Sequence, residues 1–170
     1  MNTHRNIHVL SLGGSLLFKD DALNVSFLQE LKRVIESRVA LGERFVCTVG
    51  GGKIARLYQA SAQAMGVESP EQRDWVGIHA SRLNAQFMRT LMGDLAAPEI
   101  VVDPQAPVPD AAVVFAGGSR PGWSTDYVAV SLAKNVGAKQ VINITNTTHV
   151  YDRDPAKDPA AVAYNDISWE

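Results

Sequence analysis

The segment from Gly117 to Asp126 carries the groups in this sequence that are best suited to chemistry on an anion. It reads GGSRPGWSTD and combines glycines, a cation on Arg120, hydroxyls on Ser124 and Thr125, and a carboxylate on Asp126. Loops without side chains let backbone N–H groups approach an anion, and a following helix adds about half a positive charge at its N-terminus. The segment therefore predicts a phosphate ligand. Ser124 and Asp126 also suit purely structural roles, as a helix N-cap and as a carboxylate in a first helical turn.

Two other glycine clusters occupy the same kind of position, Gly13-Gly14-Ser15 and Gly50-Gly51-Gly52. Each follows an apolar run typical of a strand and precedes a helical pattern. One such loop is a weak signal, because glycines also form tight turns, but three together favour a phosphate-binding crevice. The two common nucleotide fingerprints are missing. No G-x-G-x-x-G opens the first helix, and Trp123 stands where a P-loop needs lysine.

The elements that must position these loops alternate along the chain. Apolar runs predict strands at residues 7–12, 45–49, near 100, 112–115 and 140–145, and helical spacing predicts helices from about 26 to Gly42 and at about 54–65, 70–92 and 126–136. Repeated strand, glycine loop and helix indicate an α/β fold with a mainly parallel sheet. Ligands bind beyond the carboxyl ends of such strands, so we expect the three loops to converge on one crevice.

Two helix starts can be predicted from capping residues. Ser69 is followed by Pro70 and Gln72, which gives an N-cap, a proline at the first helical position and a glutamine three residues after the cap. Ser26 and Gln29 have the spacing of a capping box and predict a second start near residue 26.

Composition narrows the class of protein. The 170 residues include 16 Lys and Arg against 18 Asp and Glu, a net charge of −2 that leaves no electrostatic footprint for nucleic acid or an anionic membrane. The single cysteine, Cys47, lies in an apolar run and is expected to be a buried structural thiol in a reducing cytoplasm. No apolar run approaches the roughly 18 residues that span a bilayer, and the N-terminus lacks the features of an export signal.

Four segments together resemble a known family, the uridylate (UMP) kinases of the amino acid kinase family, especially the archaeal type. The segments are residues 9–17 (VLSLGGSLL), 49–56 (VGGGKIAR), 74–85 (DWVGIHASRLNA), and 117–126 continued by Thr145-Asn146 and residues 150–155 (VYDRDP). Their order and spacing agree from residue 7 to about 168. The resemblance implies one domain over residues 1–170, a three-layer sandwich, and transfer of a phosphoryl group from Mg-ATP to UMP in pyrimidine metabolism.

The resemblance also implies roles for individual residues at matched positions. The residues expected to hold UMP are Gly51, Asp74, Arg82, Ser119, Arg120, Pro121, Gly122, Trp123, Ser124 and Thr125. Those expected at ATP are Gly14, Ser15, Gly52 and Arg56 beside its phosphates, and Thr145, Tyr151 and Asp154 beside its nucleoside. Asp126 matches the aspartate that organises the transferred phosphoryl group, and Lys53 is the expected catalytic cation. Mg²⁺ arrives with ATP, and no metal-ligating side-chain cluster is expected, since neither His79 nor His149 has ligand spacing.

Several positions depart from the family pattern. Ser11 stands where many relatives carry lysine, Thr147-Thr148-His149 replace the usual Val-Asp-Gly, and Trp123 replaces a usually smaller or histidine-like residue. The family continues past the position of Glu170 through further helices and a strand, so we expect a shortened C-terminal part. The resemblance further implies a cytoplasmic homo-oligomer, typically a hexamer. Two alternatives stay open: a nucleotide- or anion-binding module without kinase activity, and a related kinase with another small phosphoryl acceptor.

Overall fold

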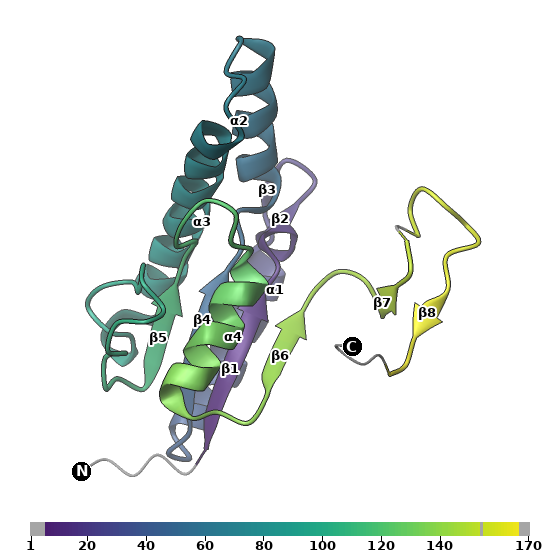
Figure 1. Cartoon of the computed structure of the whole chain (residues 1–170). Helices are drawn as coiled ribbons and strands as arrows, with labels where there is room; N and C mark the ends of the chain where they lie inside the picture. The colour runs from purple at the N-terminus through teal and green to yellow at the C-terminus, as the bar shows by residue number, and fades with distance from the viewer. Residues whose placement is uncertain (1–5, 154, 167–170) are drawn as a thin grey trace.

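The computed structural model describes residues 6–153 and 155–166 and is built around a four-stranded parallel sheet (Figure 1). Its strands are β1 (Ile7–Leu12), β4 (Arg44–Val49), β5 (Val113–Ala116) and β6 (Val141–Ile144), in the order β5-β4-β1-β6. The register pairs Ser11 with Thr48 on one side and with Asn143 on the other. The central strands β1 and β4 are thus hydrogen-bonded on both edges. Their side chains are buried on both faces of the sheet, which explains their nearly continuous apolar sequences.

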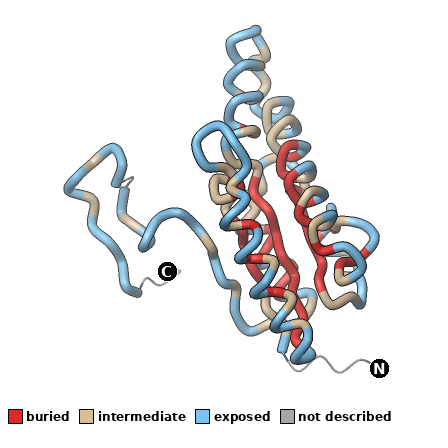
Figure 2. Tube along the Cα trace, turned by 180° about the vertical axis from the view of Figure 1, so that it is seen from behind, coloured by how far each residue is buried: buried red, intermediate tan, exposed pale blue. Residues whose placement is uncertain are grey.

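Helices cover both faces of this sheet. On one face, α1 (Val25–Val39) and α3 (Pro70–Met92) pack on the side chains that alternate along β1 and β4, among them Leu10 and Cys47. On the other face, α4 (Thr125–Val136) packs on the intervening residues, among them Val9 and Val46. Buried positions concentrate in the strands between these helices (Figure 2). The predicted three-layer α/β sandwich is therefore confirmed.

Helix α2 (Gly52–Ala64) packs beside α3, and its outer end is exposed (Figures 1 and 2). The predicted start of α3 is confirmed, because the Ser69 side chain accepts a hydrogen bond from the Gln72 N–H. The start of α1 differs from the prediction at Ser26. Asn24 is the N-cap and accepts from the Phe27 N–H, while the Ser26 hydroxyl donates to the Asn24 side chain.

The strand predicted near residue 100 was wrong as a regular element. Only isolated parallel bridges occur there, from Ala96 to Val113 and from Val101 to Ala116. Pro98 and Pro104 flank this stretch, and neither can donate a backbone hydrogen bond to a ladder. The segment follows the outer edge of β5 without forming a continuous ladder.

The remaining elements are short. A 3-10 turn, η1 (Gly14–Leu17), follows β1 and leads into the small hairpin of β2 (Phe18–Lys19) and β3 (Ala22–Leu23), and a second 3-10 turn, η2 (Gly93–Leu95), follows α3. The hairpin of β7 (Val150–Tyr151) and β8 (Ala163–Tyr164) stands apart from the main sheet beyond β6 (Figure 1). Within the described residues, no helix is long and apolar enough to cross a membrane.

Candidate active site

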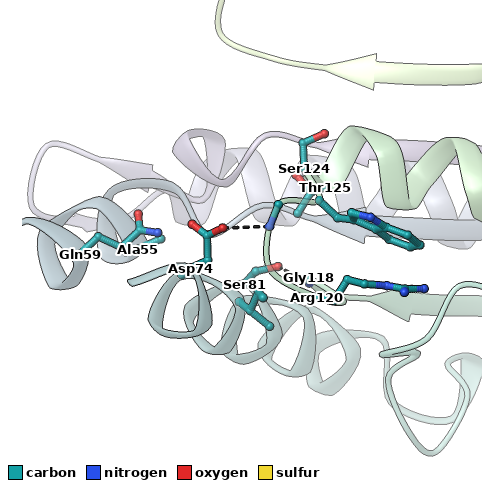
Figure 3. Close-up of a pocket in the computed structure, with 13 residues that line it drawn as sticks. Ala55, Gln59, Asp74, Ser81, Gly118, Arg120, Ser124 and Thr125 are labelled. Atoms are coloured by element: carbon teal, nitrogen blue, oxygen red, sulfur yellow. Dashed lines mark hydrogen bonds between the residues drawn. The ribbon is translucent and has the colours of Figure 1, made fainter. Parts of the chain in front are cut away.

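A cavity of about 370 Å³ opens at the carboxyl ends of β4 and β5, between α2, α3 and the loop of residues 117–124 (Figure 3). We call it the first cavity. Its lining residues are Gly51, Ala55, Gln59, Asp74, Gly77, Ile78, Ser81, Gly118, Arg120, Gly122, Trp123, Ser124 and Thr125. Seven of the ten positions expected to hold UMP are in this set. Pro121, Ser119 and Arg82 are not, although all three belong to the loop or contact it.

Asp74 holds the far end of the 117–124 loop. Its Oδ2 accepts a hydrogen bond of 2.9 Å from the Gly122 N–H (Figure 3). Gly122 has φ +79°, a left-handed conformation that glycine adopts without strain, and this turn presents its N–H to the carboxylate. Asp74 therefore fixes the loop as well as lining the cavity that the loop encloses.

Buried polar side chains of α3 hold the near ends of two glycine loops. The Ser81 hydroxyl donates to the Val49 carbonyl at 2.6 Å and accepts from the Gly118 N–H at 2.8 Å. Asn84 donates to the carbonyls of Gly50 and Gly51 at 2.8 and 3.2 Å. A single helix face thus connects the loop after β4 with the loop after β5.

Arg82 has a different position from the one expected for a phosphate-binding cation. Its Nε and Nη2 donate to the carbonyls of Gly118 and Ser119 at 2.9 and 3.0 Å, and its guanidinium lies 5.9 Å from the ring of Trp75. Both donors therefore hold carbonyl groups of the loop. The Arg82 side chain does not line the first cavity.

The first two glycine loops meet backbone to backbone. A Cβ added to Gly14 would lie 2.3 Å from the Gly50 carbonyl oxygen and 2.4 Å from the Gly52 nitrogen. Gly52 also has φ +59°, so a side chain there would be both strained and obstructed. The close approach requires glycine at these positions. Together with Ser81, it brings the three glycine loops into contact, although residues 13–15 do not line the first cavity with the other two.

Aromatic contacts define the wall of the first cavity nearest α4. The Arg120 guanidinium stacks over the Trp123 ring at 3.8 Å, and the Trp123 ring lies 4.5 Å from that of Tyr127. Ser124 caps α4 by accepting from the Tyr127 N–H at 3.1 Å, which directs the positive end of the helix toward the cavity. The predicted N-cap role of Ser124 is confirmed.

Asp126 lies in the first turn of α4, where its exposed carboxylate contacts the end of β1. The hydroxyl of Ser11 donates to Asp126 Oδ1 at 2.5 Å. Among the residues that the structure describes, none of the salt bridges involves Asp126. Its charge is therefore available to a ligand at the helix start.

Lys53 and Arg56, the cations expected at the transferred and ATP phosphates, do not line the first cavity. Lys53, at the start of α2, forms a salt bridge with Asp21 and donates to the Asp20 carbonyl at 3.2 Å. The hydrogen bond that Lys53 donates to the Asp21 side chain lowers the pKa of that carboxyl. Arg56 lines a shallow groove between α2 and α3 that also contains Asp74. In this structure the two side chains therefore do not share a common site for the ATP phosphates.

A second cavity, of about 610 Å³, lies between β6 and the β7–β8 hairpin. Thr145 and Tyr151, two residues expected at the ATP nucleoside, line it together with Thr147, Thr148 and His149. Asp154, the third, lies outside the described residues. The structure thus places Thr145 and Tyr151 in one cavity and most of the expected UMP residues in another.

Neither a thiol nucleophile nor a protein-bound metal cluster is found at this site. Burial raises the pKa of the Cys47 thiol to about 12, so it stays protonated at neutral pH. Over residues 6–153 and 155–166, no group of three or more His, Cys, Asp or Glu side chains is placed to hold a metal ion. What the site provides is backbone donors, hydroxyls, the Arg120 guanidinium and the carboxylates of Asp74 and Asp126.

Comparison with known proteins decides the family. Residues 6–170 match the model of the amino acid kinase family. The chain belongs to the amino acid kinase family. Among curated relatives, the uridylate kinases of Thermococcus onnurineus and Methanoregula boonei are 33% and 37% identical to it over 158 residues. Each alignment covers 90% of this chain, and the chain spans 68% and 65% of their respective lengths.

Solved structures agree with this amino acid kinase assignment. The crystal structure of uridylate kinase from Archaeoglobus fulgidus is 38% identical, with a TM-score of 0.76 over 94% of this chain and 72% of that one. The UMP kinase of Bacillus anthracis, 21% identical with a TM-score of 0.69, shares the fold. The resemblance drawn from the four sequence segments is therefore confirmed.

Two residues of α3 that hold the glycine loops of this site in place were not predicted from the sequence. Ser81 and Asn84 lie within a segment used for the resemblance, yet no role was predicted for them. A signal was present, because they are polar residues at helical spacing among Ile78, Ala85 and Met88, three of the apolar residues that α3 buries. A polar side chain on a buried face needs a partner, and here the partners are the glycine loops.

Proposed function

We propose that this chain is a uridylate kinase that transfers the γ-phosphoryl group of Mg-ATP to UMP and yields UDP and ADP. The observation that carries the proposal is the first cavity, where Asp74, the 117–124 loop and the N-terminus of α4 converge. Its support is a family membership shared with proteins named uridylate kinase, over most of the chain.

In this proposal UMP occupies the first cavity. Asp74 accepts hydrogen bonds from the ribose hydroxyls, because a carboxylate is a strong acceptor for a diol. The nucleotide phosphate lies at the start of α4, where Ser124, Thr125 and backbone N–H groups offer donors and the helix dipole favours an anion. Arg120, held flat on Trp123, adds a cation at the rim. Gly51 lines the same cavity with its backbone, because a Cβ there would lie 2.5 Å from the Cβ of Ala55.

In the same proposal, ATP binds on the other side of the carboxyl end of the sheet. Its nucleoside occupies the second cavity beside Thr145 and Tyr151, with Asp154 completing the contacts, and its phosphates extend toward Gly14, Ser15 and Gly52. Arg56 and Lys53 would reach the phosphates only after leaving their present surroundings. Mg²⁺ enters as part of the Mg-ATP substrate and offsets the charge of the phosphate oxygens.

The chemistry needs positioning and charge neutralisation more than a protein nucleophile. An oxygen of the UMP phosphate attacks the γ-phosphorus in line, and the bond to the bridging oxygen of the departing ADP breaks. Asp126 orients the cationic groups that surround the transferred phosphoryl group, and backbone N–H groups of the glycine loops stabilise its oxygens. Lys53 is the expected side-chain cation for this step.

The decisive experiment is a phosphoryl-transfer assay with purified protein, Mg-ATP and a panel of nucleoside monophosphates. We expect UDP to form from UMP at a rate far above a no-enzyme control, and other acceptors to react more slowly. Equal or faster turnover of another acceptor would identify a related kinase. Trp123, which lines the first cavity, is the residue that would account for such a change of acceptor. Calorimetric binding of UMP with no turnover would identify a binding module.

Assembly and location belong to the same proposal. A homo-oligomer, hexameric as the family resemblance implies, would appear in light scattering as a mass near six times the 18.4 kDa chain. A monomeric mass at assay concentration would contradict it. A cytoplasmic location accords with nucleotide substrates and with the single reduced thiol.

A further inference from the structure

The contact between Ser11 and Asp126 links a buried strand end to an exposed carboxylate. Ser11 is 2% exposed in the centre of the sheet, and its hydroxyl donates to Asp126 Oδ1 at 2.5 Å. The two residues are 115 positions apart in sequence. A contact of this kind depends on how α4 packs on β1, and it fixes the carboxylate relative to the sheet.

Ser11 has one neighbour on each adjacent strand of the sheet. The register places Thr48 beside it on β4 and Asn143 beside it on β6, so that the three side chains form one row on the α4 face. Thr48 is fully buried, and its hydroxyl has no hydrogen-bond partner among the described residues. Two hydroxyls thus lie side by side on the same face, and only that of Ser11 holds Asp126.

We propose that Ser11 is a positioning residue for Asp126 in the phosphoryl-transfer step, an inference that rests on the proposed kinase function. A neutral hydroxyl orients a carboxylate without cancelling its charge, whereas a salt bridge would cancel it. Asp126 then keeps one oxygen fixed against the sheet and its full negative charge beside the start of α4. Without Ser11 the carboxylate would rotate and lose its alignment with the cationic groups around the transferred phosphoryl group.

The kinetic test compares three variants of the full chain. Ser11→Ala removes the donor, Ser11→Thr restores a hydroxyl at the same position, and Thr48→Val removes the neighbouring hydroxyl that holds nothing. We expect Ser11→Ala to lower kcat about tenfold with KM for UMP and ATP changed less than about twofold, since a lost hydrogen bond to a charged group has that order of effect. Ser11→Thr should recover most of kcat, and Thr48→Val should leave it unchanged.

Two kinetic outcomes would overturn the proposal. One is a Ser11→Ala enzyme with the parental kcat. The other is a loss in Ser11→Ala that Thr48→Val reproduces, because that result would point to general damage at the sheet end. Thermal melting of all three variants shows whether a change in kcat accompanies loss of fold.

A readout that does not depend on kinase activity separates this proposal from the proposed function. In protein labelled with ¹³C at aspartate carboxylates, the Asp126 signal is assigned by its loss in Asp126→Asn. We expect Ser11→Ala to shift that signal at neutral pH and Thr48→Val to leave it in place. An unmoved signal in Ser11→Ala overturns the positioning role, whatever the assay shows. A shifted signal in a protein with no turnover refutes the kinase and keeps the contact.

Discussion

At the scale of single residues, the site separates groups that bind from groups that hold other groups in place. Asp74 does both, since one of its oxygens fixes the Gly122 turn while the side chain faces the first cavity. Arg82, expected from the sequence to meet a phosphate, has two donors on the carbonyls of Gly118 and Ser119. A charged residue in a motif is therefore not by itself a ligand contact, because a loop exposes carbonyls as well as N–H groups.

Replacing Asp74 tests its role toward UMP. We expect Asp74→Asn to raise KM for UMP about tenfold or more, because the charged acceptor is lost, while KM for ATP changes little. Steady-state kinetics with each nucleotide varied in turn provide the measurement. Glu71→Gln is the matched control, a carboxylate in the first turn of the same helix that does not line the cavity. Equal increases in both KM values would remove Asp74 from the UMP site.

Replacing Asp126 tests the catalytic assignment. Asp126→Asn keeps the shape of the side chain and an oxygen that can accept from Ser11, but it removes the charge. We expect kcat to fall about 100-fold or more, in line with the loss of a preorganised electrostatic group, with the melting temperature nearly unchanged. Asp94→Asn, in η2 and away from the cavity lining, serves as the control. Retained turnover in Asp126→Asn would exclude the residue from the mechanism.

At the scale of elements, the sequence predicts well where local rules decide and less well where neighbours decide. Strands β1 and β4, the cap at Ser69 and the α4 start at Ser124 follow from apolar runs and capping chemistry. The N-cap of α1 differs because Asn24, two residues earlier, competes for the same N–H groups. The stretch near residue 100 is apolar like a strand, yet its flanking prolines interrupt the pairing that a strand needs.

The junction of the first two glycine loops can be tested with a matched pair of glycines. Gly52 and Gly66 both have positive φ, at +59° and +90°, but only Gly52 has backbone of another loop, Gly14, against its Cβ position. Both substitutions by alanine carry the strain of a left-handed residue, about 1–2 kcal/mol. We expect Gly52→Ala to lower the melting temperature by several degrees more than Gly66→Ala and to weaken ATP binding in calorimetry. Equal effects would show that the loops can separate freely.

At the scale of the whole molecule, the two ends of the sheet differ in how their charged and polar groups are arranged. The carboxyl end presents loop backbone N–H groups and hydroxyls, as an anion-binding site requires, and none of the salt bridges among the described residues involves Asp126 there. The amino end closes with a charge cluster. Glu43, which is 6% exposed, accepts from Arg38 of α1 and from His8 of β1, joining helix, loop and strand. Because the His8 contact joins residues 35 positions apart, the composition alone could not indicate this cluster.

This cluster predicts how stability depends on pH. The hydrogen bond from Arg38, with a further one from His8, holds the pKa of Glu43 below its ordinary value of 4.5. A carboxyl with a lowered folded-state pKa stabilises the native state above its unfolded pKa, and that contribution is lost as the pH falls through the folded value. We therefore expect the melting temperature to drop as the pH is lowered below 4.5, and Glu43→Gln to reduce both the neutral-pH stability and this acid dependence.

The control is Glu30→Gln, which removes an exposed pair with Arg33 and should change the pH profile much less, because solvent screens that pair. Parallel pH profiles for the parent and Glu43→Gln would show that the cluster does not hold the amino end of the sheet together.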